Sequence, residues 1–88
     1  MLRYAAKVDG PHAAIRDGLR KLGWLVLDSA RMASGGPDLI AVTPEGVVRL
    51  FEVKAPQGRL RPRQQALQAQ GWPIRVVTTL DEALDWRY

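Results

Sequence analysis

Three residues suggest chemistry in this 88-residue chain: Asp38, Glu52 and Lys54. Glu52 and Lys54 lie two residues apart in residues 47–54, a stretch that is otherwise apolar on both faces of a strand and is therefore expected to be covered. Charged groups on a covered strand are costly unless they are paired or bind an ion. Lys54 would neutralise one carboxylate, and the remaining negative charge with its oxygen ligands suits Mg²⁺ or Mn²⁺. The alternative is a salt-bridged cluster at the sheet edge.

A predicted hairpin brings the two carboxylates together. The strands on either side of Pro44-Glu45-Gly46 suit a three-residue loop closed by glycine in the left-handed region. Pairing of Thr43 with Val47 across this loop places Asp38 opposite Glu52. Opposed side chains in a sheet have Cβ atoms about 5 Å apart, and like charges there are destabilising. The register therefore predicts that the two carboxylates lie close together, an arrangement that a bound cation would stabilise.

Caps, periodicity and chain breakers predict the remaining elements. A first helix is expected to begin near Asp9-Gly10-Pro11, with proline at its first position, and to end at Gly23. The Ser34-Gly35-Gly36-Pro37 stretch lies in a predicted loop, residues 31–37. The elements expected after the first helix are strands 24–27, 39–43 and 47–54, a helix over 62–70, a strand over 74–78 and a short helix opened by the Thr79–Glu82 capping box. This order predicts one α/β domain over residues 1–88, a sandwich with a mixed sheet.

Composition excludes several classes of protein. Hydrophobic residues make up 47% and charged residues 25%, as in ordinary globular domains. The chain has no cysteine and one histidine, which argues against a disulfide scaffold and the usual structural zinc sites. No apolar run is long enough to span a bilayer, and no signal-peptide pattern is present. The expected setting is therefore the cytoplasm, and no membrane partner is expected.

Basic residues are distributed unevenly. The net charge is +4, and residues 53–80 contain five cations and no acidic residue. Arg59, Arg61 and Arg63 precede and open the predicted second helix, where guanidinium groups and helix N-terminal amides would attract phosphate oxygens. This asymmetry predicts DNA as a partner; a solvated basic surface is the alternative.

The order and spacing of three motifs resemble a known nuclease family. They are Gly36-Pro37-Asp38-Leu39-Ile40, Phe51-Glu52-Val53-Lys54 and Gly58-Arg59-Leu60-Arg61-Pro62-Arg63-Gln64. Together they resemble the virus-type replication-repair nuclease (VRR-NUC) domains of the PD-(D/E)XK superfamily, including compact stand-alone phage forms. The resemblance covers nearly the whole chain. It implies a restriction-endonuclease-like α/β sandwich, in the cytoplasm of a bacterial or phage-infected cell.

The resemblance also implies an activity and a set of site residues. It implies Mg²⁺- or Mn²⁺-dependent hydrolysis of DNA phosphodiesters, on branched, flap or junction DNA, in DNA repair. By matching position, Asp38 and Glu52 correspond to the metal-binding carboxylates, Lys54 to the catalytic lysine and Gln64 to the motif glutamine. The backbone carbonyl of Val53 corresponds to a further metal ligand.

One position departs from the family pattern. Members carry a glutamate on the first helix where this chain has His12, which we expect as a softer ligand or a hydrogen-bond partner without negative charge. The alternative is a surface histidine at the start of a helix. This departure favours, as the alternative function, a catalytically weak nucleic-acid-binding module. A serine hydrolase that uses His12 with Ser29 or Ser34 is disfavoured, because neither serine lies in a G-x-S-x-G elbow. No phosphate-cradling or dinucleotide motif is present, so no nucleotide cofactor is expected.

The chain is also predicted to form a homodimer. A domain of this size has a small core. It would have to bury the large apolar surface of three tryptophans: Trp24, Trp72 and Trp86. Two-fold pairing is the commonest way to bury such surface. The expected contact surface is the first helix with Trp24 or the C-terminal helix with Trp86, and the alternative for these tryptophans is the core.

Overall fold

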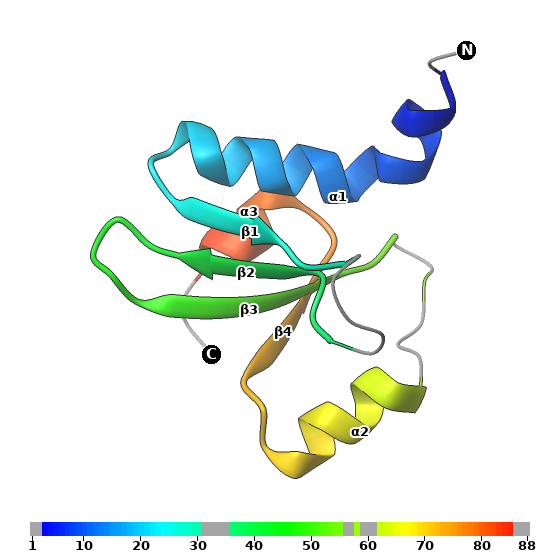
Figure 1. Ribbon diagram of the computed structural model, residues 1–88, viewed down its shortest axis with the longest axis vertical. Helices are drawn as coiled ribbons and strands as arrows, with labels where there is room; N and C mark the ends of the chain where they lie inside the picture. The colour runs from blue at the N-terminus through cyan, green and yellow to red at the C-terminus, as the bar shows by residue number, and fades with distance from the viewer. Residues whose placement is uncertain (1–2, 31–35, 56–57, 59–61, 86–88) are drawn as a thin grey trace.

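A four-stranded mixed sheet forms the centre of the molecule (Figure 1). The computed structural model describes residues 3–30, 36–55, 58 and 62–85. Within these ranges the elements are α1 (Arg3–Lys21), β1 (Leu25–Asp28), β2 (Leu39–Val42), β3 (Val48–Val53), α2 (Pro62–Gln70), β4 (Ile74–Val77) and α3 (Leu80–Leu84). The strand order is β1-β2-β3-β4, with the last pair parallel and the other two antiparallel. The predicted α/β class is confirmed, and β3 lies inside the sheet.

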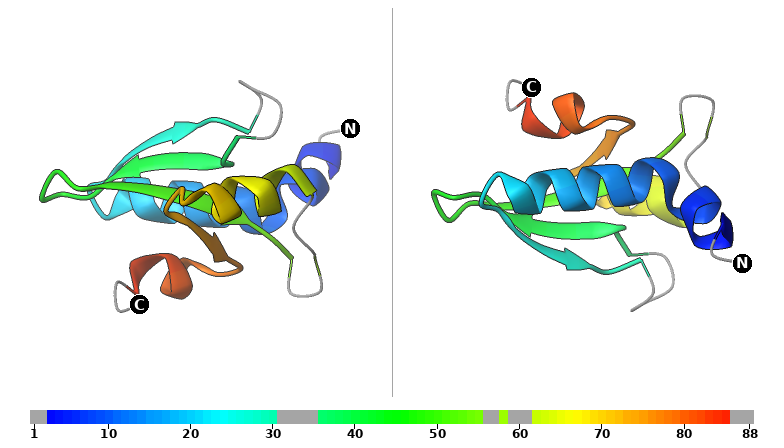
Figure 2. Two further views of the ribbon diagram at one scale, coloured as in Figure 1. Left: turned by 90° about the horizontal axis from the view of Figure 1, so that it is seen from below. Right: turned by 90° about the horizontal axis from the view of Figure 1, so that it is seen from above.

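The helices lie on both sides of this sheet. Figure 2 shows α1 and α2 on opposite faces, so that the view from below has α2 in front and α1 behind. Helix α3 packs against α1, where a Cβ on Gly18 would lie 2.7 Å from Leu80 Cδ2. A larger residue at position 18 would therefore force the Leu80 side chain to move. We call the face covered by α1 the inner face and the opposite one the outer face.

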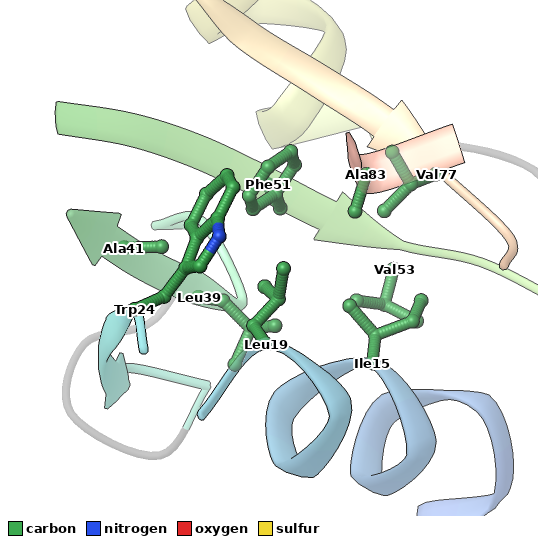
Figure 3. Close-up of a cluster of buried hydrophobic side chains, with 9 residues drawn as sticks. All are labelled: Ile15, Leu19, Trp24, Leu39, Ala41, Phe51, Val53, Val77 and Ala83. Carbon is green, nitrogen blue, oxygen red and sulfur yellow. The ribbon is translucent and has the colours of Figure 1, made fainter. Parts of the chain in front are cut away.

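The hydrophobic core lies between α1, α3 and the inner face (Figure 3). Phe51 and Val53 of β3 point toward Ile15 and Leu19 of α1. Trp24 is buried in the same cluster, with its ring centroid 6.3 Å from that of Phe51. Of the two places expected for Trp24, core or interface, the structure has the core, because this side chain is buried within its own chain. Trp86 lies outside the described residues.

The hairpin between β2 and β3 has the predicted geometry. Thr43 N donates to Val47 O at 2.9 Å, and Gly46 has a φ of +92°. The Thr43 hydroxyl oxygen also accepts from Val47 N at 3.0 Å. Because the three-residue loop fixes the register, this turn determines which side chains of the two strands face each other.

The first helix differs from its prediction. It begins at Arg3 rather than near Asp9, and Pro11 lies inside it. The residues before Gly10, including Ala5 and Ala6, are good helix formers and extend the helix toward the N-terminus. Proline then removes one backbone hydrogen bond, and Figure 1 shows the first turns of α1, in dark blue, set at an angle to the rest.

The C-terminal elements agree with the sequence reading. Thr79 caps α3, with its hydroxyl accepting from Glu82 N at 3.2 Å, and α2 has the predicted bounds.

Strand β1 begins one residue later than expected and includes Asp28. None of the described helices is long and apolar enough to cross a membrane.

Candidate active site

The hairpin register brings the two predicted carboxylates to one end of the β2–β3 ladder. The ladder runs from Val42↔Val48 to Leu39↔Phe51, and Asp38 follows directly beyond it. Its carboxylate lies near enough to Glu52 to raise the pKa of that group. Phe51 points to the inner face, and alternation therefore directs Glu52 to the outer face. The predicted juxtaposition is thus present in the structure. We call Asp38, Glu52 and Lys54 the carboxylate pair with its lysine.

Backbone contacts hold Asp38 from both sides. Its N–H donates to Phe51 O at 2.9 Å, and its Oδ2 accepts from Val53 N at 2.9 Å. Its carbonyl oxygen accepts from Ser29 N at 3.0 Å. Buried Ser29 also donates from its hydroxyl to Pro37 O at 2.7 Å. Asp38 is therefore fixed by its neighbours on β1 and β3 before any ligand binds.

Glu52 is the most unusual group of the site. Its exposed fraction is 1%, and its Oε1 has no hydrogen-bond partner in the part of the chain that the structure describes. Its Oε2 lies 3.6 Å from Lys54 Nζ. Burial and the nearby Asp38 carboxylate raise the pKa of Glu52 to about 7, although Lys54 opposes this shift. The folded chain thus has a carboxylate that is costly to ionise without a further cation.

The structure describes some of the other expected site residues completely and others only in part or not at all. Gln64 of α2 is buried. Helix α2 lies over the outer face of the sheet (Figure 2), the face to which alternation along β3 directs Glu52. Arg63 lies in α2, but its side chain is outside the described part, as are all of Arg59 and Arg61. The Val53 N–H is used by Asp38.

His12 belongs to a second charged cluster. Its Nε2 lies 3.1 Å from Asp28 Oδ1, and Arg16 Nη1 donates to Asp28 Oδ2 at 3.1 Å. Asp28 pairs with Leu39 across β1 and β2, so its side chain is on the inner face with α1. We call His12, Arg16 and Asp28 the helix anchor. Within the described ranges, no three His, Cys, Asp or Glu side chains come together as a metal-binding group.

Asp28 and Ser29 are residues near the site for which the sequence analysis predicts no structural role. The serine hydrolase stays disfavoured, because the Ser29 hydroxyl donates to Pro37 O and His12 pairs with Asp28. Ser34 lies outside the described residues. The signal that could have found Asp28 is a single carboxylate at the end of an otherwise apolar strand, residues 24–28.

The carboxylate pair fits a hard divalent cation. Two facing carboxylates and one lysine leave a net negative charge, and Glu52 Oε1 is a buried oxygen without a donor. Oxygen ligands with incomplete charge compensation are what Mg²⁺ and Mn²⁺ favour. The helix anchor offers no such group, because Asp28 accepts from His12, from Arg16 and, at 3.4 Å, from Ala30 N.

Comparisons with known proteins agree with this arrangement. The profile of the VRR-NUC domain matches residues 7–77 of the chain. A solved structure described as a VRR_NUC domain superposes with a TM-score of 0.67 at 26% identity, covering 88% of this chain and 92% of that one. A search of curated protein sequences gave no match. The chain therefore belongs to the VRR-NUC family, and it is a nuclease-type domain with a restriction-endonuclease-like fold.

Proposed function

We propose that this domain is a Mg²⁺- or Mn²⁺-dependent DNA endonuclease whose site contains Asp38, Glu52, Lys54 and Gln64. The observation that carries the proposal is the buried Glu52 carboxylate, which faces Asp38 and keeps one oxygen without a donor. A purely structural ion pair would satisfy that oxygen, since an unpaired buried polar atom destabilises the fold. We infer that the oxygen is kept for a ligand.

The proposed roles follow from how each side chain is held. Asp38 and Glu52 bind the cation, with the Val53 carbonyl as a further oxygen ligand. A divalent cation bound there supplies Lewis-acid activation of a phosphodiester and of water. Lys54, on the same strand face as Glu52, orients or deprotonates the attacking water or stabilises negative charge on the phosphate. Buried Gln64 donates hydrogen bonds within the site.

Arg59, Arg61 and Arg63 are proposed to contact DNA phosphates. They precede and open α2, whose N-terminal amides favour anions. Replacing all three with Ala should weaken binding to every DNA alike. Each lost phosphate contact should reduce the slope of log affinity against log salt by about 0.9 for duplex DNA. Lys21→Ala, at the exposed end of α1, is a control that should leave the slope unchanged.

The second candidate is a catalytically weak nucleic-acid-binding module. It is favoured by one observation: His12 replaces the glutamate that resemblance to the family leads us to expect, and it is paired with Asp28 rather than with the carboxylate pair. Such a module would bind DNA through the same arginines without cleaving it. Such a module would recognise DNA by its shape rather than by contacts to the bases.

Cleavage assays distinguish the two candidates. Labelled duplex, flap and four-way-junction DNA are incubated with Mg²⁺, Mn²⁺ or EDTA. The nuclease proposal predicts cleavage that EDTA abolishes and that Glu52→Gln removes. Glu45→Gln is the matched control, because Glu45 is exposed in the hairpin loop and undergoes the same chemical change. Binding without cleavage under all metal conditions would support the weak module and overturn the nuclease.

A further inference from the structure

A hollow of about 510 Å³ lies on the outer face between β3, β4 and the C-terminal part of α2. Its wall is aliphatic and comes from adjacent positions of the two strands, which alternation directs to this face: Val48, Leu50, Ile74 and Val76. Pro73 and Gln68 also line it. Pockets that hold small organic groups have volumes of roughly 300–1,000 Å³ and mostly apolar walls. We call this cavity the sheet hollow.

The sheet hollow is continuous with the carboxylate pair. Val76 pairs with Glu52 across β3 and β4, and Ile74 pairs with Leu50 at the next outer-face position. Two residues along a strand span about 7 Å, and a single extended nucleotide covers that distance. A DNA strand with a phosphate at the carboxylate pair can therefore place the adjoining base in the sheet hollow.

The wall of the sheet hollow fits a base rather than a phosphate. Its four aliphatic side chains carry no charge. Arg49 and Arg75 also belong to the lining, but they alternate with the aliphatic residues and their side chains are directed to the inner face. Phosphates are bound by Lys and Arg side chains, whereas a base presents a flat ring face that packs on apolar and aromatic groups.

Two groups at the rim suit the edge and the ring face of a base. Gln68 Nε2 donates to Ile74 O at 3.0 Å, so the amide is held against β4 and its Oε1 can accept from the N–H on the pairing edge of a base. Trp72, the chain neighbour of Pro73, is 54% exposed. Trp72 N donates to Leu67 O at 3.2 Å, and Trp72 O accepts from Ile74 N at 2.8 Å. This fixed turn presents an indole on which a base can stack.

We propose that the sheet hollow binds an unpaired base of the DNA, next to the phosphate at the carboxylate pair. The proposal rests on the proposed function and adds to it a site that determines specificity. Extruding a base from a duplex costs unstacking and unpairing energy, which is least for a base that is already unpaired. Since every base has a ring face, the sheet hollow detects an unpaired nucleotide and not a sequence.

Binding to a single-nucleotide bulge tests the proposal, measured by fluorescence anisotropy in EDTA so that no cleavage is needed. Two labelled duplexes differ only at the bulge, which carries either a base or an abasic residue. The wild-type chain should bind the base-containing bulge at least about fivefold more tightly. Trp72→Ala removes the stacking surface and Val76→Phe fills the hollow, so each should bring the two affinities within about twofold. Leu22→Ala is the matched control: Leu22 is 52% exposed just after α1, outside the hollow, and the variant should keep the wild-type preference.

Two results would overturn the proposal. One is equal affinity of the wild-type chain for the two bulges, and the other is a base preference that persists in both Trp72→Ala and Val76→Phe with native circular dichroism. Equal affinities together with a sedimenting mass that changes in Val76→Phe would assign the hollow to a second copy of the chain instead.

Adding Mg²⁺ to the same DNA tests the nuclease separately. A base preference without cleavage would support the sheet hollow and overturn the nuclease. Cleavage without a base preference would keep the nuclease and overturn the sheet hollow.

Discussion

The carboxylate pair and the helix anchor contain the same kinds of groups in opposite electrostatic states. In the helix anchor, the Asp28 carboxylate accepts from His12 and from Arg16, and Arg16 also donates to the exposed carboxylate of Asp17. In the carboxylate pair, Glu52 lies beside Asp38, and Lys54 Nζ lies 3.6 Å from Glu52 Oε2. Partial burial opposes ionisation of Asp28, yet the hydrogen bonds from His12 and Arg16 lower its pKa. Burial and Asp38 instead raise the pKa of Glu52 to about 7.

This difference distinguishes a cluster that stabilises the fold from the site proposed to bind a cation. The helix anchor joins α1 to the end of β1 on the inner face, and each Asp28 oxygen has a donor. In the carboxylate pair on the outer face, Glu52 Oε1 has no donor among the residues that the structure describes. Whether each carboxylate oxygen has a donor, rather than the number of acidic residues, therefore distinguishes the two clusters and favours the carboxylate pair as the proposed cation site.

The largest expected effect is the loss of cleavage when the carboxylate pair is broken. Asp38→Asn removes one ligand charge and little volume, so we expect at least about a thousandfold loss of rate while the fold remains. Asp28→Asn makes the same chemical change in the helix anchor and should alter the rate less than about fivefold. Initial rates on labelled DNA in Mg²⁺ measure both. Equal losses in the two variants would remove the distinction between the clusters.

The second effect concerns the pH dependence of stability without metal. The pKa of Glu52 is higher in the folded chain than its ordinary value of 4.5, so folding retains a proton that unfolding releases. The free energy of unfolding should fall as pH rises from about 4.5 to about 7 and stay lower above that. Glu52→Gln should therefore stabilise the chain at pH 8 by up to about 3 kcal/mol.

Urea denaturation in EDTA at pH 5 and pH 8 checks this prediction. The gain in unfolding free energy from Glu52→Gln should be smaller at pH 5, where Glu52 of the folded wild type is already protonated. Glu45→Gln is the control, with little change at either pH because Glu45 is exposed. A variant that is destabilised more at pH 8 than at pH 5 would show that ionised Glu52 is already stabilised in the metal-free fold.

The third effect is the opposite pH trend in the helix anchor. The pKa of Asp28 is lowered by its partners, so its stabilising contribution is present above its ordinary pKa and is lost as pH falls through the lowered one. Asp28→Ala should destabilise the chain by about 1–2 kcal/mol at pH 7, and by less in acid. Urea denaturation at pH 7 and pH 3 measures the change. An equal loss of unfolding free energy at pH 3 and at pH 7 in Asp28→Ala would show that ionised Asp28 does not stabilise the fold.

The smallest effect is expected at Ser29. Ser29→Ala removes the hydroxyl that donates to Pro37 O, which should cost about 1 kcal/mol of unfolding free energy. Because Ser29 N also donates to Asp38 O, a shift at this position should weaken Mn²⁺ binding by a few-fold while leaving the helix anchor intact. Denaturation and metal titration together measure it. Stability loss with unchanged Mn²⁺ affinity would make Ser29 structural only.

The local part of the fold and the core of the site could be predicted from the sequence. The Pro44-Glu45-Gly46 loop determines one register, and that register alone brings Asp38 close to Glu52. Turn chemistry is a short-range property, which is why it is readable in a single sequence. The start of α1 was misread because helix formers before Gly10 outweighed the cap signal at Pro11.

Tertiary contacts account for what the sequence could not predict. Whether His12 meets the carboxylate pair or Asp28 depends on which face of the sheet α1 covers, and no local pattern specifies that face. The same holds for Trp24, because the sequence allows either the core or an interface for this side chain and only the packed fold buries it, with its ring 6.3 Å from that of Phe51. Glu52 looked like a ligand from its spacing, but its donor-free oxygen is a property of the packed fold.

Mn²⁺ titration by isothermal calorimetry, with wild type, Glu52→Gln and Asp28→Asn compared at pH 8, measures whether the carboxylate pair binds the cation. Glu52→Gln should weaken Mn²⁺ binding by at least about tenfold, because it removes a ligand charge, whereas Asp28→Asn should bind Mn²⁺ like the wild type. Wild-type affinity in Glu52→Gln, or an equal loss in Asp28→Asn, would contradict the assignment of the cation to the carboxylate pair.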